Sequence, residues 1–433
     1  MNKIFYLIFI TIILSGCTSS KTSKFWQKSE KIDQNKTKAE KVFNNEKVLN
    51  KEFNKNLKIN FDDNFNTHNL NSHYTNNNGR LNFDGDLKKN ARYKFAKIKN
   101  FYQYEPSISF NEKELFFFEN KGSILKFNEN LKLVWKKNYY SKTEKKLNPI
   151  IQFANNKNFL IAADNLAKYY MLNIKTGKLI WSKNNLAPFN SQIKIYKNKF
   201  FIIDFSNTLR CFSLKDGSEL WNVKTQNSLI RSQKKLSMVI VKDVILFNNS
   251  IGDISAGDLD KGELLWQLPT QNSLIYESAF SLESSDIVSD NDNLFFSNNK
   301  NKFFSIDIST GSFNWKNKIN SNLRPIIDGN ILLSISQEGY LFLIDKNNGN
   351  ILRSTDVFDG FKLKKRNKIK PTGFILGINK IYLSTNNGSL LTIDITSGKT
   401  TSALKIDNEK ILRPVIFNKS LFIVKDNTII KLN

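Results

Sequence analysis

A turn ending in glycine and followed four residues later by tryptophan recurs along this chain and constrains its fold more than any other feature. Two later copies keep the glycine and replace the tryptophan, at Gly349 with Arg353 and at Gly398 with Ser402, and an earlier copy keeps Trp135 without the glycine. Successive tryptophan-equivalent positions lie 38 to 49 residues apart. Tryptophan at one repeated position predicts packing between repeats rather than several active sites. The complete copies are Gly177 with Trp181, Gly217 with Trp221, Gly262 with Trp266, and Gly311 with Trp315.

Each repeat is predicted to form four short antiparallel strands. In one copy, residues 340–344 alternate before Asp345 opens a turn, Gly349 supplies the positive φ that closes the turn, and a second strand follows. Upstream, residues 325–327 and 331–335 are two further apolar runs that Asp-Gly-Asn separates. Four antiparallel strands in a period of about 40 residues are typical of a β-propeller blade. Helical periodicity is nearly absent, which disfavours a helical solenoid.

The count of repeats predicts an all-β fold, an eight-bladed β-propeller of four-stranded blades over residues 91–433. Seven blades centre on the tryptophan-equivalent positions. Residues 411–417, 421–424 and 428–432 supply only three strands for the eighth blade, so residues 93–98 are predicted to add the fourth. Such a strand would close the ring and remove two exposed sheet edges.

The first residues are typical of a lipoprotein signal peptide. An apolar run over residues 4–14 is too short to cross a bilayer and ends in Leu14-Ser15-Gly16-Cys17, the lipobox pattern. We expect cleavage after residue 16 and lipidation of Cys17, and the absence of aspartate after the cysteine favours the outer membrane. Residues 17–90 are rich in Asn and Lys, and we expect them to be a mostly disordered tether.

Several classes of chemistry are disfavoured by composition. With Cys17 lipidated, Cys211 has no partner for an intrachain disulfide, and no cysteine-rich metal site is expected. The two histidines, His68 and His73, lie in the polar stretch before the repeats, which disfavours histidine catalysis and metal binding. The net charge of +26 comes from scattered lysines, and export removes nucleic acid as a partner. We therefore expect no cofactor and no metal.

The repeats resemble the PQQ-type propeller repeat, whose core is Asp-x-x-x-Gly-x-x-x-Trp. Together with the lipobox and a single eight-bladed propeller, they resemble the BamB family of outer membrane protein assembly factors. This resemblance implies a non-catalytic scaffold on the periplasmic side of the outer membrane. It also implies binding to the periplasmic domains of a BamA-like insertase and to unfolded β-barrel precursors, as a monomer within a hetero-complex.

The resemblance also implies which residues bind the partner. In the connection between blades three and four, Leu229 and Ile230 would be apolar contacts and Arg231 a cationic contact. In the next connection, Glu283 and the nearby Asp286 would supply acidic contacts. An exposed apolar pair beside arginine is a usual interface anchor. The alternative is that Leu229 and Ile230 begin the inner strand of blade four and that Arg231 is solvated.

Two other functions stay open from the sequence. The first is a propeller lipoprotein that binds another periplasmic partner, such as a peptide, a glycan or a divisome protein. The second is a PQQ-dependent dehydrogenase, which would use the same repeat around a quinone and calcium. The chain has no adjacent cysteines, and turns account for its alignable aspartates, such as Asp258, Asp307, Asp345 and Asp394. These features disfavour the enzyme.

Overall fold

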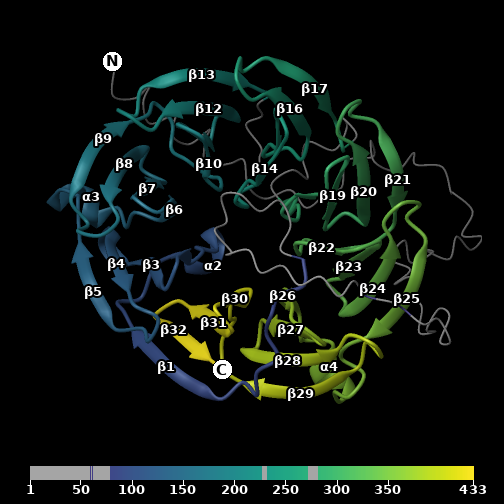
Figure 1. The fold of residues 1–433 in the computed structure, drawn as a ribbon. Coiled ribbons are helices and arrows are strands. Elements are labelled where there is room, and N and C mark those ends of the chain that lie inside the picture. The colour runs from purple at the N-terminus through teal and green to yellow at the C-terminus, as the bar shows by residue number, and fades with distance from the viewer. Residues whose placement is uncertain (1–58, 60, 62–78, 227–231, 272–280) are drawn as a thin grey trace, which may run out of the picture. The chain divides into compact units, whose positions relative to one another are not determined.

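The computed structural model describes residues 59, 61, 79–226, 232–271 and 281–433, all of which belong to one compact unit, Leu49–Asn433. The described chain contains eight four-stranded antiparallel sheets, which follow one another in chain order around a central axis (Figure 1). The prediction of an eight-bladed β-propeller is confirmed. The signal peptide, Cys17 and both histidines lie outside the described residues.

The four strands of each blade follow one another from the axis outward. Blade one is β2 (Ser109–Asn111), β3 (Glu114–Glu119), β4 (Ser123–Phe127) and β5 (Leu133–Lys137); blade two is β6 (Ile151–Asn155), β7 (Phe159–Asp164), β8 (Lys168–Asn173) and β9 (Leu179–Asn184); blade three is β10 (Lys194–Tyr196), β11 (Lys199–Ile203), β12 (Thr208–Ser213) and β13 (Glu219–Lys224); blade four is β14 (Met238–Val241), β15 (Val244–Asn248), β16 (Ile254–Asp258) and β17 (Leu264–Leu268).

The second half of the ring has the same order. Blade five is β18 (Val288–Ser289), β19 (Asn293–Asn298), β20 (Lys302–Asp307) and β21 (Phe313–Asn317); blade six is β22 (Ile326–Asp328), β23 (Ile331–Ile335), β24 (Tyr340–Asp345) and β25 (Ile351–Asp356); blade seven is β26 (Pro371–Leu376), β27 (Lys380–Thr385), β28 (Ser389–Asp394) and β29 (Thr400–Lys405); blade eight is β30 (Val415–Phe417), β31 (Ser420–Lys425), β32 (Thr428–Leu432) and β1 (Lys89–Lys94). The short helices are α2 (Phe101–Tyr104), α3 (Lys142–Lys146), α4 (Leu363–Arg366) and a 3-10 turn at Asn120–Gly122.

Burial differs sharply between the inner and outer strands of a blade. The second strand of blade one, β3, is buried along nearly its whole length, whereas the outer strand β5 is largely exposed. Each sheet packs between two neighbours, so both of its faces are apolar, and the inner strands are nearly continuous apolar runs rather than alternating ones. The core therefore consists of the layers between blades.

The ring closes in blade eight, where β1 pairs with β32 in the order β1-β32-β31-β30. The predicted donor strand at 93–98 was misplaced, because the strand is Lys89–Lys94. Phe95 and Ile98 are instead buried in a loop that leads to α2, so their apolar character comes from packing and not from strand pairing. The predicted strand at 411–417 is likewise shorter, because β30 covers only Val415–Phe417.

The packed body begins before residue 91, which was predicted to be its first residue. Leu81 and Phe83 are 4% and 3% exposed and belong to an apolar cluster between blades seven and eight. The backbone N–H of Leu81 donates to the carbonyl of Leu376 at 3.1 Å, and the N–H of Ile378 donates to the carbonyl of Phe83 at 3.0 Å. Both residues had been predicted to belong to the tether, because their neighbours in the sequence are polar. In the structure they pack between blades seven and eight.

The repeat tryptophans lie between neighbouring blades. Gly262 has a φ of +73°, and a Cβ built on it would lie 2.4 Å from the ring of Trp221 in the preceding blade. Because a Cβ there would overlap the ring, the repeat needs glycine both for its turn and for this close approach. The same contact joins Gly177 to Trp135, Gly217 to Trp181, Gly311 to Trp266 and Gly349 to Trp315, whereas Gly398 meets Thr355.

Hydrogen bonds repeat the same connection between blades. The indole N–H of Trp315 donates to the carbonyl of Lys346 at 2.9 Å, and Trp181 and Trp266 make the equivalent bond at 3.1 and 3.0 Å. Arg353, which replaces tryptophan in blade six, donates from its guanidinium to the carbonyl of Ile395 at 3.3 Å. The arginine therefore satisfies the same carbonyl position that the indole satisfies elsewhere.

Candidate functional site

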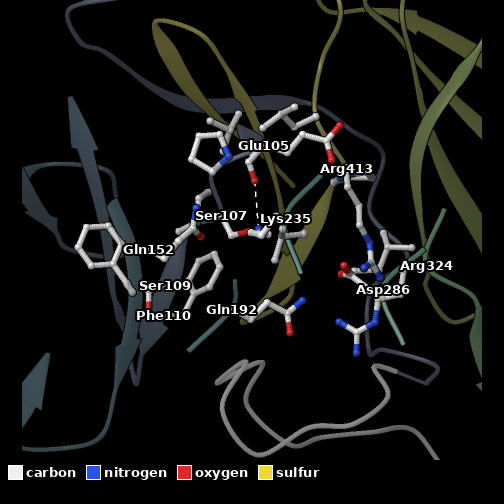
Figure 2. Close-up of a pocket in the computed structure, with 18 of the residues that line it drawn as sticks. Glu105, Ser107, Ser109, Phe110, Gln152, Gln192, Lys235, Asp286, Arg324 and Arg413 are labelled. Carbon is white, nitrogen blue, oxygen red and sulfur yellow. Dashed lines mark hydrogen bonds between the residues drawn. The ribbon is translucent and has the colours of Figure 1, made fainter. Parts of the chain in front are cut away.

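The site that all eight blades help to build is a pocket on the propeller axis, which we call the axial pocket. It consists of two adjoining cavities of about 190 and 370 Å³, an inner and an outer one. Both cavities are lined by Glu105, Lys234, Asp286, Arg324, Thr372 and Arg413, and Figure 2 shows the inner one. Side chains reach the axis because the first strand of each blade is the innermost one, so the connection that enters this strand faces the axis.

The loop after α2 positions the acidic side of the pocket. Glu105 caps this helix with a φ of 42°, and its carboxylate pairs with Lys410 at 2.9 Å. Lys235 donates from Nζ to the Glu105 carbonyl at 3.2 Å and to the Ser107 hydroxyl at 3.0 Å, as the dashed contact in Figure 2 indicates. Burial opposes ionisation of Glu105, but Lys234 and Lys410 hold the pKa of this carboxyl below its usual range.

The basic side of the pocket comes from blades six and eight. Arg324 and Arg413 each lie two residues before the innermost strand of their blade, and Asp286 occupies the same position in blade five. Figure 2 shows these three side chains gathered on one side of the pocket. Burial opposes ionisation of Asp286, but Arg324 and Lys235 hold its pKa below the ordinary value.

Burial and repulsion between neighbouring cations lower the pKa values of two basic groups at the axis. Burial and the neighbouring Arg324 lower the pKa of Arg413 to about 9. The same two causes lower the pKa of Lys194, which is 3% exposed, to about 7. Asp286 opposes both shifts without cancelling them. The axis therefore carries more positive charge than its carboxylates neutralise.

The two acidic residues predicted to bind a partner occupy different places. Glu283 is exposed at the mouth of the outer cavity, where its carboxylate accepts a hydrogen bond from the Asn322 amide. Its backbone N–H donates to the Asn299 side chain at 3.0 Å. Asp286 is half-buried inside the axial pocket, among the arginines. Glu283 therefore belongs to the mouth of the outer cavity, and Asp286 belongs to the interior of the axial pocket.

The predicted contacts Leu229, Ile230 and Arg231 lie outside the described residues. The described residue that follows them, Ser232, lines the outer cavity, and its hydroxyl donates to the carbonyl of Leu282 at 2.6 Å. Leu282 itself stands directly before Glu283. The innermost strand of blade four, β14, begins at Met238, well after Arg231, which disfavours the alternative that Leu229 and Ile230 begin this strand.

The basic residues of the axial pocket were not predicted from the sequence. Lys235, Arg324 and Arg413 line the pocket, Lys194 lies near it, and all four lie at or just before the first strand of a blade. Aligning the repeats on this first strand, instead of on the glycine turn, would have placed Gln192, Asp286, Arg324 and Arg413 at one equivalent position. That alignment requires the strand starts, which the weak patterns of the innermost strands do not reveal.

Metal binding and thiol chemistry lack a suitable site in the part of the chain that the structure describes. It contains no group of three or more His, Cys, Asp or Glu side chains arranged to hold a metal ion. Cys211 is a free thiol on β12, and burial raises its pKa to about 12, so it stays protonated and unreactive at neutral pH. None of the helices in the described ranges is long and apolar enough to cross a membrane.

Comparisons with known proteins agree with the repeat and the fold. A family model described as outer membrane protein assembly factor BamB matches residues 120–355. A curated relative, outer membrane protein assembly factor BamB of Shewanella oneidensis, is 21% identical over 348 residues, which span 66% of this chain and 82% of the relative.

Solved structures show the same fold at lower sequence identity. BamB from Moraxella catarrhalis superposes with a TM-score of 0.64 at 14% identity, over 80% of this chain and 99% of that chain. Quinohemoprotein alcohol dehydrogenase from Comamonas testosteroni superposes with a TM-score of 0.62 at 9% identity, over 84% of this chain and 80% of that one. These structures share the propeller architecture, while the family model, which matches more than half of the sequence, shows that the chain belongs to the BamB family of outer membrane protein assembly factors.

Proposed function

We propose that this protein is a non-catalytic scaffold lipoprotein of the β-barrel assembly machinery. Lipidated Cys17 would anchor it to the periplasmic side of the outer membrane, and the propeller would bind the periplasmic domains of a BamA-like insertase. Membership of the BamB family supports this role. The closed packing of the blades supports a rigid scaffold, because neighbouring blades are joined by ring contacts and hydrogen bonds such as those of Trp315.

The observation that carries the proposal is the junction of the two connections predicted to bind the partner. The bond between Ser232 and Leu282 joins the end of the blade three to four connection to the end of the blade four to five connection. Two segments 50 residues apart in the chain thus meet at one mouth of the axial pocket. A partner that touches one of them can touch the other.

The proposed contact surface combines charge and apolar area. Leu229 and Ile230 would be the apolar anchors, Arg231 the cationic contact, and Glu283 the exposed carboxylate of the same surface. Asp286 lies deeper, so we assign it a role in shaping the charge of the mouth. Interfaces of this kind gain most of their affinity from a few such anchors, and charged rim residues set orientation and association rate.

A second surface suits unfolded barrel precursors. The outer strands of blades one to four are sheet edges, and each has one or two exposed apolar side chains near its start. An extended segment can add to such an edge by main-chain hydrogen bonds while its side chains cover the apolar groups. The exposed residues, between 41% and 52% accessible, are Leu133, Val134, Leu179, Ile180, Leu220, Leu264 and Leu265.

Photo-crosslinking in cells tests both surfaces with one matched control. A photoreactive residue at Ile230 or Glu283 should give an adduct with the insertase, and one at Ile180 should capture barrel precursors. Leu363 in α4 is 78% exposed between blades six and seven and should give neither adduct. Recovery of other periplasmic proteins without the insertase, or equal capture at Leu363, would overturn the proposal.

A charge reversal measures the strength of the contact. Arg231→Glu should weaken capture of the insertase about tenfold, or about 1.4 kcal/mol, without a change in melting temperature. Lys145→Glu, on the exposed helix α3, is the control with the same change in charge. A large fall in melting temperature for Arg231→Glu alone would show that this arginine is structural.

A further inference from the structure

Basic groups outnumber acidic groups in the inner cavity of the axial pocket. Its lining contains Lys234, Lys235, Arg324 and Arg413, but only Glu105 and Asp286 as acids. Glu105 already pairs with Lys410 at 2.9 Å. Lys234 and Lys235 also act on the charge of Glu105, so two carboxylates face the four cations of the lining and Lys410. The buried Lys194 adds a further amine nearby, where Arg324 and Asp286 act on its charge.

Two of the arginine nitrogens are buried without a hydrogen-bond acceptor among the described residues. They are Nε of Arg324 and Nη2 of Arg413. Arg413 is held in place from its other side, because its Nε donates to the carbonyl of Phe374 at 3.0 Å. A buried donor without an acceptor costs free energy, and the cost is larger for a charged group. These donors thus point to an acceptor that the described residues do not provide.

From this arrangement we infer that the axial pocket is a binding site for a small polyanion, a molecule that carries two or more carboxylate or phosphate groups. Guanidinium groups match the oxygens of carboxylates and phosphates and bind them through paired hydrogen bonds. The amides of Gln152 and Gln192 and the hydroxyl of Thr372 line the same cavity and add neutral polar partners. Figure 2 shows Gln192 near the arginine side of the pocket.

The size of the pocket selects a small ligand over a polymer. The inner cavity measures about 190 Å³, and the outer cavity, at about 370 Å³, is the larger of the two. A compact anion enters such a space, whereas a nucleic acid or a folded acidic domain meets the rim first. Carboxylate and phosphate ligands share the chemistry that the site recognises, so two probes distinguish them.

The charges predict opposite effects for two substitutions. Arg324→Gln removes a cation and the unpartnered Nε donor, so it should weaken binding of the anion. Asp286→Asn removes the carboxylate that competes with the ligand for the same arginines, so it should strengthen binding. If Asp286 only stabilised the fold, its substitution would not increase the affinity for the anion. The opposite effects expected for the two variants therefore distinguish a binding site from a structural cluster.

Isothermal titration of the full chain with citrate and with inorganic phosphate tests the inference at constant ionic strength. We expect saturable binding of at least one probe, with affinity at least tenfold lower in Arg324→Gln and severalfold higher in Asp286→Asn. Citrate binding without phosphate binding would assign the site to polycarboxylates, and the reverse would assign it to phosphates.

The matched control is Lys145→Gln, which removes one partly exposed cation in α3, outside the lining of the axial pocket, and should leave the affinity unchanged. The inference is overturned if neither probe binds saturably. It is also overturned if chloride competes equally well at the same ionic strength, or if Arg324→Gln and Lys145→Gln reduce affinity by the same factor. If Arg324→Gln fails to fold, the gain of affinity in Asp286→Asn still decides.

Discussion

The contact between a repeat glycine and the preceding tryptophan predicts a large and specific loss of stability for Gly262→Ala. Two costs add in this variant. The φ of +73° lies in the left-handed region, which costs an L-residue about 1–2 kcal/mol. The new methyl group would lie 2.4 Å from the ring of Trp221, and overpacking of this kind costs about 1–3 kcal/mol. We expect the free energy of unfolding to fall by about 2–5 kcal/mol.

The control for this prediction is Gly360→Ala. No atom lies within 4 Å of a Cβ built on Gly360, and its φ is outside the left-handed region. Replacing such a glycine with alanine reduces the conformational freedom of the unfolded chain alone. The free energy of unfolding should therefore rise by about 0.4–1 kcal/mol. Guanidinium unfolding followed by far-UV circular dichroism measures both variants on the same scale.

A double-mutant cycle separates the two costs of Gly262→Ala. In a Trp221→Ala background the ring is gone, so Gly262→Ala should lower the free energy of unfolding only by the backbone cost of about 1–2 kcal/mol. The coupling energy between the two sites should therefore be about 1–3 kcal/mol. Equal losses in both backgrounds, or a loss below about 0.5 kcal/mol in the native background, would refute the reasoning that the glycine is required by the neighbouring blade.

Two further predictions concern buried charged groups. Burial raises the pKa of Asp164 from 3.8 to about 6. Between about pH 4 and pH 6, this carboxyl therefore stays protonated in the folded state and loses its proton in the unfolded state. The free energy of unfolding should therefore fall as pH rises from about 4 to about 6, by on the order of 3 kcal/mol, and Asp164→Asn should flatten this slope in urea unfolding. Arg353→Met should lower the free energy of unfolding by about 1–3 kcal/mol, because it removes the hydrogen bond that the Arg353 guanidinium donates to the Ile395 carbonyl. Arg353→Trp should restore much of this stability, because the indole N–H can donate to the same carbonyl. Equal stability of the methionine and tryptophan variants would contradict the assigned role of the Arg353 guanidinium.

The blade and its repetition could be predicted from the sequence because the signals are local. A turn such as Asp345 to Gly349 requires residues a few positions apart, and the strands on either side of it show their apolar character directly. The closing strand followed from counting, because three strands at the C-terminus left one unpaired edge. Its position was off by a few residues, since Phe95 and Ile98 are apolar for a reason unrelated to strand pairing.

The charge of the axis was decided only by the tertiary structure. Asp286, Arg324 and Arg413 belong to three different blades, and nothing in their local sequence distinguishes them from solvated residues. Closing eight sheets into a ring brings their connections to one axis and partly buries these side chains in one pocket. The same closure separates Glu283, which stays at the mouth, from Asp286, which enters the pocket. Periodicity along a chain determines which face of a strand is buried, but the distance between charges on different blades depends on how the whole ring closes.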